Sequence, residues 1–181
     1  MSIKTSILID GGYLREILNR KRGHRYYPKP EEVLNFCNSL IKDEEVLYRI
    51  FFYDAKPDND NNSDYFFNKI ESQPFFALRM GRLVNHTPKG GPLNYVQKGV
   101  DMKIGLDIAS MAYKKLVERI VLITNDTDLI PAIKLARING IQVRIINLDS
   151  IHSLFQAHSD MWEKIEIEDH FSESLKKGKK Q

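Results

Sequence analysis

The sequence predicts an α/β protein with a mostly parallel central sheet and helices on both faces. Short apolar runs rich in β-branched residues alternate with longer segments in which apolar residues recur at helical spacing. This alternation is typical of strand–helix–strand units, which form parallel sheets. The run over 120–123 is wholly apolar, as expected of a strand buried on both faces. An acidic turn follows it, and then Pro131, which is best tolerated in the first turn of a helix.

Six segments are expected to form strands. The first, over 3–9, is largely apolar and ends at the turn Asp10-Gly11-Gly12. The second, over 45–53, is rich in aromatic and β-branched residues, which favour strands. The last, over 162–167, is expected at an edge of the sheet. The remaining strands are expected over 76–84, 120–124 and 141–147.

Helices are expected between these strands. Over 99–115, apolar residues from Ile104 to Ala112 share one face at helical spacing. The helix over 128–138 is expected to end at Asn139-Gly140, a common C-terminal signal. Further helices are expected over 13–22, 31–41, 65–73 and 150–157, with polar loops over 54–64 and 86–93.

The composition bounds the class of protein. The chain has 181 residues, 42% of them hydrophobic and 28% charged, which is ordinary for one globular domain. A net charge of +3 is too mild to indicate a nucleic-acid partner by itself. The single cysteine, Cys37, lies in a helical pattern and is expected to be buried. An internal disulfide, a Cys-rich zinc site and a catalytic thiol at an exposed cysteine are therefore not expected.

One domain over 1–171 is expected, followed by a basic tail over 172–181 that is expected to be disordered. No signal-peptide pattern is present at the N-terminus, and no apolar run approaches the roughly 20 residues of a membrane span. We therefore expect a cytoplasmic protein without a membrane partner.

Four aspartates are expected to meet at one edge of the sheet. Asp10 ends the first strand, Asp126 and Asp128 follow the strand over 120–124, and Asp101 lies in the first turn of a helix. In a parallel sheet with helical connections, the carboxyl ends of strands and the N-termini of helices lie on the same edge, where ligands bind. Asp101 also shares a side of its helix with Ile108, so it is expected to point toward the sheet.

Each aspartate also has a structural interpretation, because Asp is a favoured N-cap residue. Asp10 alone, Asp101 alone, or Asp126 with Asp128 would each be explained by capping. The convergence of all four on one edge favours a functional site, since closely packed carboxylates repel unless a cation or proton lies between them. Asp107, six residues after Asp101, is a candidate for a further contact or for a solvated side chain.

A cluster of carboxylates without cysteine favours a hard cation such as Mg²⁺ or Mn²⁺ over zinc. Such an ion usually keeps water ligands and binds phosphate oxygens, which indicates metal-assisted hydrolysis of a phosphodiester. The chain contains neither a G-x-G-x-x-G loop nor a P-loop, and no serine lies in a nucleophile-elbow context.

Three segments resemble the NYN domain family, part of the PIN-like nuclease superfamily, and in particular its LabA-like branch. They are Ile7-Leu-Ile-Asp10-Gly11, Lys98-Gly-Val-Asp-Met-Lys-Ile-Gly-Leu-Asp107, and Ile123-Thr-Asn-Asp-Thr-Asp-Leu129 followed by Gly140-Ile-Gln-Val143. They follow the order of the family and span almost the whole chain. Two positions depart from its pattern. Tyr13 lies where many relatives have asparagine, and Asn125 lies where glycine is common.

The resemblance implies a PIN-like three-layer sandwich and an endoribonuclease that uses Mg²⁺ or Mn²⁺. It implies that the catalytic and metal-binding residues are Asp10, Asp101, Asp126 and Asp128. Three further residues are expected to contact these carboxylates or the ion directly: Asp107, Thr124 and Asn125.

The implied partner is RNA, expected to be single-stranded. Because an acidic edge repels phosphate, cations are needed at its rim, and Lys89 and Lys98 are the nearest in sequence. A non-catalytic domain that keeps the fold and binds RNA or another protein is the alternative, and the sequence leaves it open. Whether the chain forms a homo-oligomer is also open.

Overall fold

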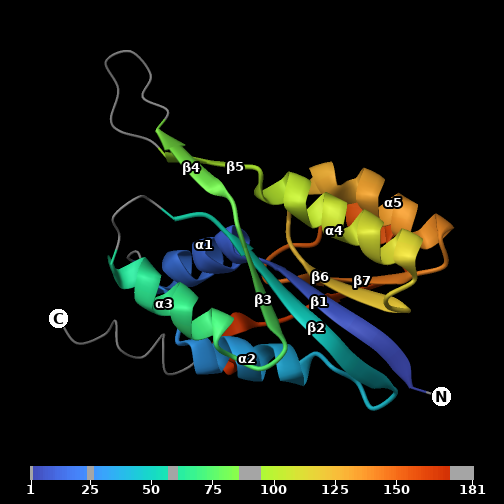
Figure 1. Ribbon diagram of the computed structural model, residues 1–181, viewed down its shortest axis with the longest axis horizontal. Helices are drawn as coiled ribbons and strands as arrows, with labels where there is room; N and C mark the ends of the chain where they lie inside the picture. Colours follow the sequence, from blue (N-terminus) through green and yellow to red (C-terminus); the bar gives the residue numbers. More distant parts are fainter. Residues whose placement is uncertain (1, 24–26, 57–60, 86–94, 172–181) are drawn as a thin grey trace.

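The computed structural model describes residues 2–23, 27–56, 61–85 and 95–171. Its centre is a six-stranded sheet in the order β3-β2-β1-β6-β7-β8, and every neighbouring pair of strands is parallel (Figure 1). The strands are β1 (Ile3–Asp10), β2 (Glu45–Asp54), β3 (Phe76–Met80), β6 (Arg119–Ile123), β7 (Gln142–Asn147) and β8 (Met161–Lys164). The fold class expected from the alternation of strands and helices is confirmed.

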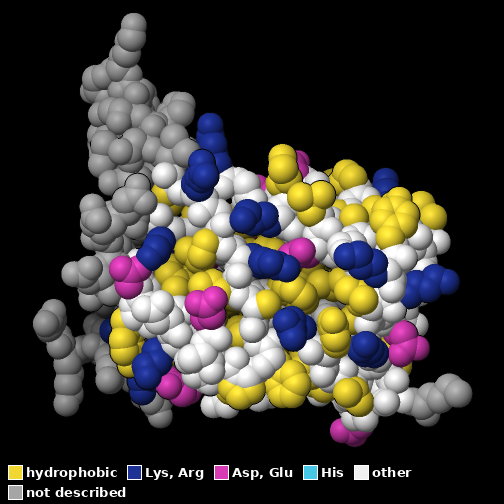
Figure 2. Space-filling model, viewed as in Figure 1, with side chains coloured by type: hydrophobic (Ala, Val, Ile, Leu, Met, Phe, Trp, Pro, Cys, Tyr) yellow, Lys and Arg dark blue, Asp and Glu magenta, His cyan; other side chains and the backbone are white. Residues whose placement is uncertain are grey.

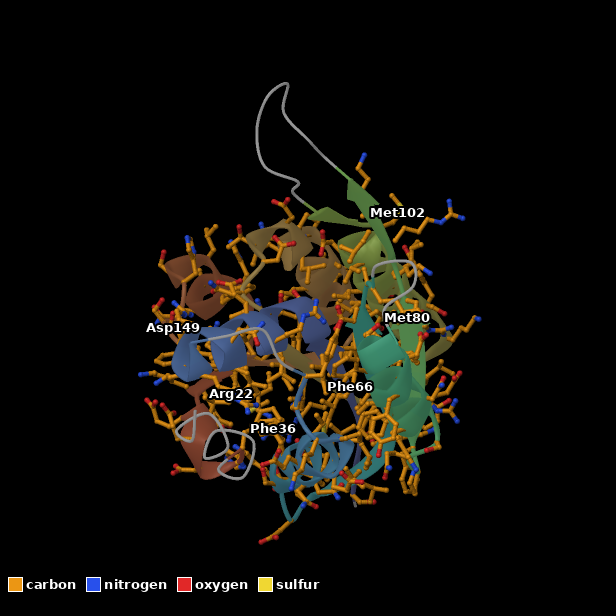
Figure 3. The ribbon with its side chains drawn as sticks, turned by 90° about the vertical axis from the view of Figure 1, so that its left-hand side faces the viewer. Arg22, Phe36, Phe66, Met80, Met102 and Asp149 are labelled. Carbon is orange, nitrogen blue, oxygen red and sulfur yellow. The ribbon has the colours of Figure 1, made fainter. Side chains whose placement is uncertain are left out.

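Helices cover both faces of the sheet and make a three-layer sandwich. On one face, buried side chains of α1 (Gly11–Arg22), α2 (Pro30–Ser39) and α3 (Asn61–Glu71) pack against the sheet. Phe36 of α2 and Phe66 of α3 lie inside this layer (Figure 3). On the other face, the covering helices are α4 (Val100–Lys114), α5 (Ile130–Ile138) and α6 (Ser153–His158). The expectation that Cys37 is buried is also confirmed.

The order of the strands defines where a ligand is expected to bind. From β1 the chain moves outward through β2 to β3, and it then returns to β6 on the opposite side of β1. The direction of winding therefore reverses between β1 and β6. In doubly wound sheets, ligands bind outside the carboxyl ends of the two strands at such a switch point. The carboxyl ends of β1 and β6 are the places where Asp10 and Thr124 lie.

The expected strand over 76–84 is wrong in one respect, because it is two strands in different sheets. β3 ends at Met80, and β4 (Arg82–Asn85) pairs with β5 (Tyr95–Lys98) in a separate antiparallel sheet. The break falls at Gly81, where a Cβ would lie 2.9 Å from the carbonyl oxygen of Lys98 and 2.6 Å from a Val100 methyl group. Only glycine permits this approach, and the chain leaves the main sheet here.

The other differences are small. β5 was not expected from the sequence, because four residues are too few to show a period. α3 begins four residues before the expected start, inside the predicted polar loop. The predicted loop over 86–93 and the predicted tail over 172–181 lie outside the described residues. None of the helices in the described part of the chain has the length and apolar composition of a membrane-spanning helix.

Candidate active site at the carboxyl edge of the sheet

Asp10 is at the centre of a group of carboxylates. It is the last residue of β1 and is only 9% exposed. The pKa of its carboxyl group is raised to about 6, mainly by burial and in addition by the nearby charges of Asp101, Asp54 and Asp126, whereas the hydrogen bond from the Tyr13 backbone opposes the rise. A carboxyl group that is both buried and surrounded by like charges is a common feature of functional sites.

Local structure fixes the orientation of Asp10. Its side chain caps α1, and its Oδ1 atom accepts a hydrogen bond of 3.1 Å from the backbone N–H of Tyr13. The helix begins immediately at Gly11, where a Cβ would lie 2.6 Å from the Phe52 ring and 2.7 Å from the Tyr53 carbonyl oxygen. The Asp-Gly pair therefore lets α1 begin directly against β2, which keeps the carboxylate at the end of the strand.

Thr124 connects Asp10 with the turn after β6. Its hydroxyl donates to Asp10 Oδ2 at 3.4 Å and accepts from the backbone N–H of Asp126 at 3.1 Å. Asp126 caps the short 3₁₀ turn over Thr127–Leu129, and its Oδ1 atom accepts from the backbone N–H of Asp128 at 2.9 Å. Capping thus occupies the Oδ1 atoms of Asp10 and Asp126. Their Oδ2 atoms make no backbone hydrogen bond within the described residues.

Asp101 joins this group from the first turn of α4. The expectation that it points inward is wrong, because Asp101 is exposed. Its side of the helix instead faces the next helical segment, since a Cβ on Gly105, one turn later, would contact Ala132 at 3.8 Å. Partial burial, the charges of Asp126 and Asp128, and a hydrogen bond with Asp126 together raise the pKa of Asp101. The four predicted aspartates therefore interact electrostatically, although their catalytic and metal-binding roles stay predictions.

Asp54 belongs to the same group and was missed in the sequence. It is the last residue of β2, it is 1% exposed, and its charge raises the pKa of Asp10. Its Oδ1 atom accepts from the backbone N–H of Ala55 at 2.7 Å, and its Oδ2 atom forms an ion pair with Arg15 of α1. Its position directly after the expected strand over 45–53 is the available signal, but the sequence places it in the polar loop expected over 54–64.

The remaining predicted residues are more scattered. Asp107 lies two turns along α4, where its Oδ2 atom accepts from the Tyr53 hydroxyl at 2.9 Å and from Arg79 Nε at 3.2 Å. Asn125 is exposed in the turn after β6. Lys98 is exposed at the end of β5, one residue before the N-cap of α4. Lys89 lies outside the described residues.

Tyr13, the first departure from the family pattern, has a structural role here. It is buried, and its hydroxyl accepts a hydrogen bond of 2.9 Å from the backbone N–H of Leu148. This contact ties α1 to the segment after β7. The neighbouring Asn147, also fully buried, donates from Nδ2 to the carbonyl oxygen of Thr124 at 3.3 Å. The carboxyl ends of β1, β6 and β7 are therefore held together beneath the aspartates.

The donor set fits a hard divalent cation in its chemistry, since every titratable group in it is a carboxylate. In the part of the chain that the structure describes, no three His, Cys, Asp or Glu side chains are placed so that they would already hold an ion. The side chains of Asp101 and Asp128 are exposed, so a change between staggered rotamers is sterically open to both. Binding would require such an adjustment of these two side chains toward Asp10 and Asp126.

Comparison with known proteins gives one strong similarity. The NYN domain model matches residues 4–167, which is nearly the whole chain. No curated protein matches the sequence. A chain from a study of the mechanism and regulation of Sir2 enzymes shares 12% identity with a TM-score of 0.43, covering 98% of this chain and 92% of its own. The UDP complex of LpCGTa shares 12% identity with a TM-score of 0.32, covering 81% of this chain and 31% of its own. At these scores, neither structure bears on the function.

Proposed function

Because this chain belongs to the NYN domain family of PIN-like nucleases, we propose that it is a divalent-metal-dependent endoribonuclease that hydrolyses phosphodiester bonds in RNA. The observation that carries the proposal is the convergence of carboxylates on Asp10 at the switch point of the sheet. Asp54, Asp101 and Asp126 come from three other segments, and each raises the pKa of Asp10 by its charge. Caps explain single aspartates, but they do not explain four that repel one another.

The residues have different proposed roles. Asp10, Asp101, Asp126 and Asp128 would hold the ion, Mg²⁺ or Mn²⁺. Asp10 and Asp126 would bind it through the Oδ2 atoms that capping leaves available. Such an ion supplies an activated water and stabilises the leaving oxygen. Asp54 would add negative charge behind Asp10 without binding the ion, because Arg15 and the Ala55 backbone occupy its oxygens.

The test is cleavage of a fluorescent RNA in Mg²⁺, Mn²⁺ or EDTA. We expect cleavage only with metal, with products that carry a 5′-phosphate and a 3′-hydroxyl, because the nucleophile is water. Asp10→Asn, Asp101→Asn and Asp126→Asn should each remove most of the activity. Asp43→Asn is the matched control, because Asp43 is exposed just before β2, at the opposite edge of the sheet.

A product that ends in a 2′,3′-cyclic phosphate and forms in EDTA would rule out this mechanism. RNA binding in EDTA without cleavage under any metal condition would favour the alternative of a non-catalytic RNA-binding domain. The LabA-like branch and the cytoplasmic location stay predictions from the sequence.

A further inference from the structure

Cations without an acidic partner gather on one face of the molecule. Over most of the described surface, Lys and Arg side chains form ion pairs, such as Arg20 with Asp149 and Lys21 with Glu168. Next to α4, most of them do not. Figure 2 shows dark-blue side chains across the middle of this face, where Figure 1 shows α4 beside β3 and β2. We call six exposed residues the basic strip: Arg49, Arg79, Arg82, Lys98, Lys103 and Lys114. Arg49 and Arg79 lie on the α4 face of the sheet, because they alternate along β2 and β3 with Phe51 and Ala77, which pack on that face.

The basic strip has a fixed geometry. Arg79 is its one member with an ion pair among the described residues, to Asp107, which also accepts from the Tyr53 hydroxyl. Arg79 also lies over the Phe51 ring, at 5.7 Å from the centroid. These contacts join β3, β2 and α4. Asp107, the acidic group beside the strip, is thus already paired with Arg79, and the other five members of the strip form no ion pair within the described residues.

One end of the strip is next to the aspartates. Arg82 and Lys98 are paired across the β4–β5 sheet, and Lys98 is three residues before Asp101. From there the strip follows α4, since Lys103, Asp107 and Lys114 share one side of the helix at spacings of four and seven residues. At 1.5 Å per residue, Lys103 and Lys114 are roughly 16 Å apart along the helix axis.

An apolar row runs parallel to the basic strip. Met102, Leu106 and Tyr113 repeat the same spacing one residue earlier on α4, and they are 70%, 63% and 69% exposed. These values are high for large apolar side chains. Figure 3 places Met102 at the outer surface near β4 and β5, and yellow side chains lie along α4 in Figure 2. We call these three residues the apolar row.

We propose that the basic strip and the apolar row together bind single-stranded RNA along α4, with its phosphates on the strip and its bases on the row. Unstacked bases bind to aromatic and apolar surfaces, whereas a duplex hides its base faces. Roughly 16 Å corresponds to at most about five nucleotides at the ~3.4 Å of a stacked strand, and to fewer in an unstacked strand, which is more extended. A second copy of this chain is disfavoured as the occupant, because two basic strips repel. The choice of RNA rests on the proposed function.

The experiment measures RNA binding by fluorescence anisotropy in EDTA, so that cleavage plays no part. The strip variant is Arg49→Ala, Lys103→Ala and Lys114→Ala together. The control variant, Lys21→Ala, Lys69→Ala and Lys164→Ala, removes the same charge elsewhere. For a 12-nucleotide RNA, the strip variant should lower the slope of log affinity against log salt by about 2, from three contacts at ~0.7 each. The control variant should leave the slope unchanged, and a tetranucleotide should show a smaller effect.

The row variant, Met102→Ala, Leu106→Ala and Tyr113→Ala, separates stacking from charge. It should weaken binding of the single strand on the order of tenfold, leave the salt slope unchanged, and have no effect on an RNA duplex. Equal losses in the strip and control variants would overturn the proposal, as would equal loss for duplex and single strand in the row variant. Binding of polyglutamate to the strip in place of RNA would overturn it in favour of an acidic protein partner.

The proposed function and this inference fail in different ways. Strip-dependent binding of single strands without cleavage in Mg²⁺ or Mn²⁺ would reject the nuclease and support the strip. Metal-dependent cleavage with no binding difference between the strip and control variants would support the nuclease and reject the strip. The substituted side chains are all exposed, so thermal unfolding followed by circular dichroism should be unchanged and confirms that each variant is folded.

Discussion

Replacement of Asp10 by asparagine should stabilise the metal-free protein at neutral pH. The folded-state pKa of Asp10 is about 6, compared with an ordinary value of 3.8. Ionisation of this buried group therefore opposes folding. The pKa difference of about 2.2 units corresponds to about 3 kcal/mol of unfolding free energy, at ~1.36 kcal/mol per unit. Asparagine cannot ionise, and its Oδ1 atom can still cap α1 and accept from the Tyr13 backbone.

The sign of the pH dependence follows from the raised pKa. The stability that Asp10 contributes is fully present below pH 3.8 and is lost as the pH rises through about 6. Asp10→Asn and the wild type should therefore be about equally stable near pH 4. The difference should grow by ~1.4 kcal/mol per pH unit and level off above about pH 6, with the variant more stable.

Urea denaturation in EDTA at several pH values from 4 to 8 measures this difference directly. Asp43→Asn is the control, because it removes a carboxylate that is exposed at the opposite edge, and its effect should be small at every pH. Addition of Mg²⁺ should stabilise the wild type more than Asp10→Asn. A difference between the variant and the wild type that is equal at pH 4 and pH 8, or a less stable variant at pH 8, would refute the reasoning.

Three further predictions concern the same edge. Millimolar Mn²⁺ should raise the melting temperature of the wild type in differential scanning fluorimetry, because binding at 100 times the Kd adds about 2.7 kcal/mol to the free energy of unfolding. Asp126→Asn should reduce this shift, and an unchanged wild-type curve would count against the site. Asp54→Ala leaves the guanidinium of Arg15, which is 14% exposed, without its buried partner. Chemical denaturation should therefore show a free energy of unfolding lower by about 3–5 kcal/mol, and a decrease of less than about 1 kcal/mol would contradict the pairing. Gly11→Ala places a Cβ 2.7 Å from the Tyr53 carbonyl oxygen and should lower the free energy of unfolding by at least about 1–3 kcal/mol in the same assay. A variant as stable as the wild type would show that α1 can move away from β2.

The sequence alone determined the order of the elements and where most of the acidic side chains lie along them. Periodicity revealed the buried strands and the amphipathic helices, because burial on one or two faces constrains every second, third or fourth residue. Asp10, and Asp126 or Asp128, are candidate caps from the sequence, because capping involves residues two or three positions apart, and the structure shows Asp10 and Asp126 as the caps. Such signals are local, and a single sequence displays them directly. The family resemblance over three separated segments added the expected sandwich, and the family match over 4–167 confirmed it.

The tertiary structure alone decided which side chains meet. Asp54 joins the site because β2 is the neighbour of β1, and Asp107 pairs with Arg79 of the basic strip because α4 packs against β3. Likewise, Arg144, 1% exposed, pairs with Glu45, which no local pattern indicates. These contacts depend on the order of strands and on helix packing between residues 28 to 99 positions apart in sequence. That order follows from the way the whole chain buries its apolar surface, and no short segment encodes it.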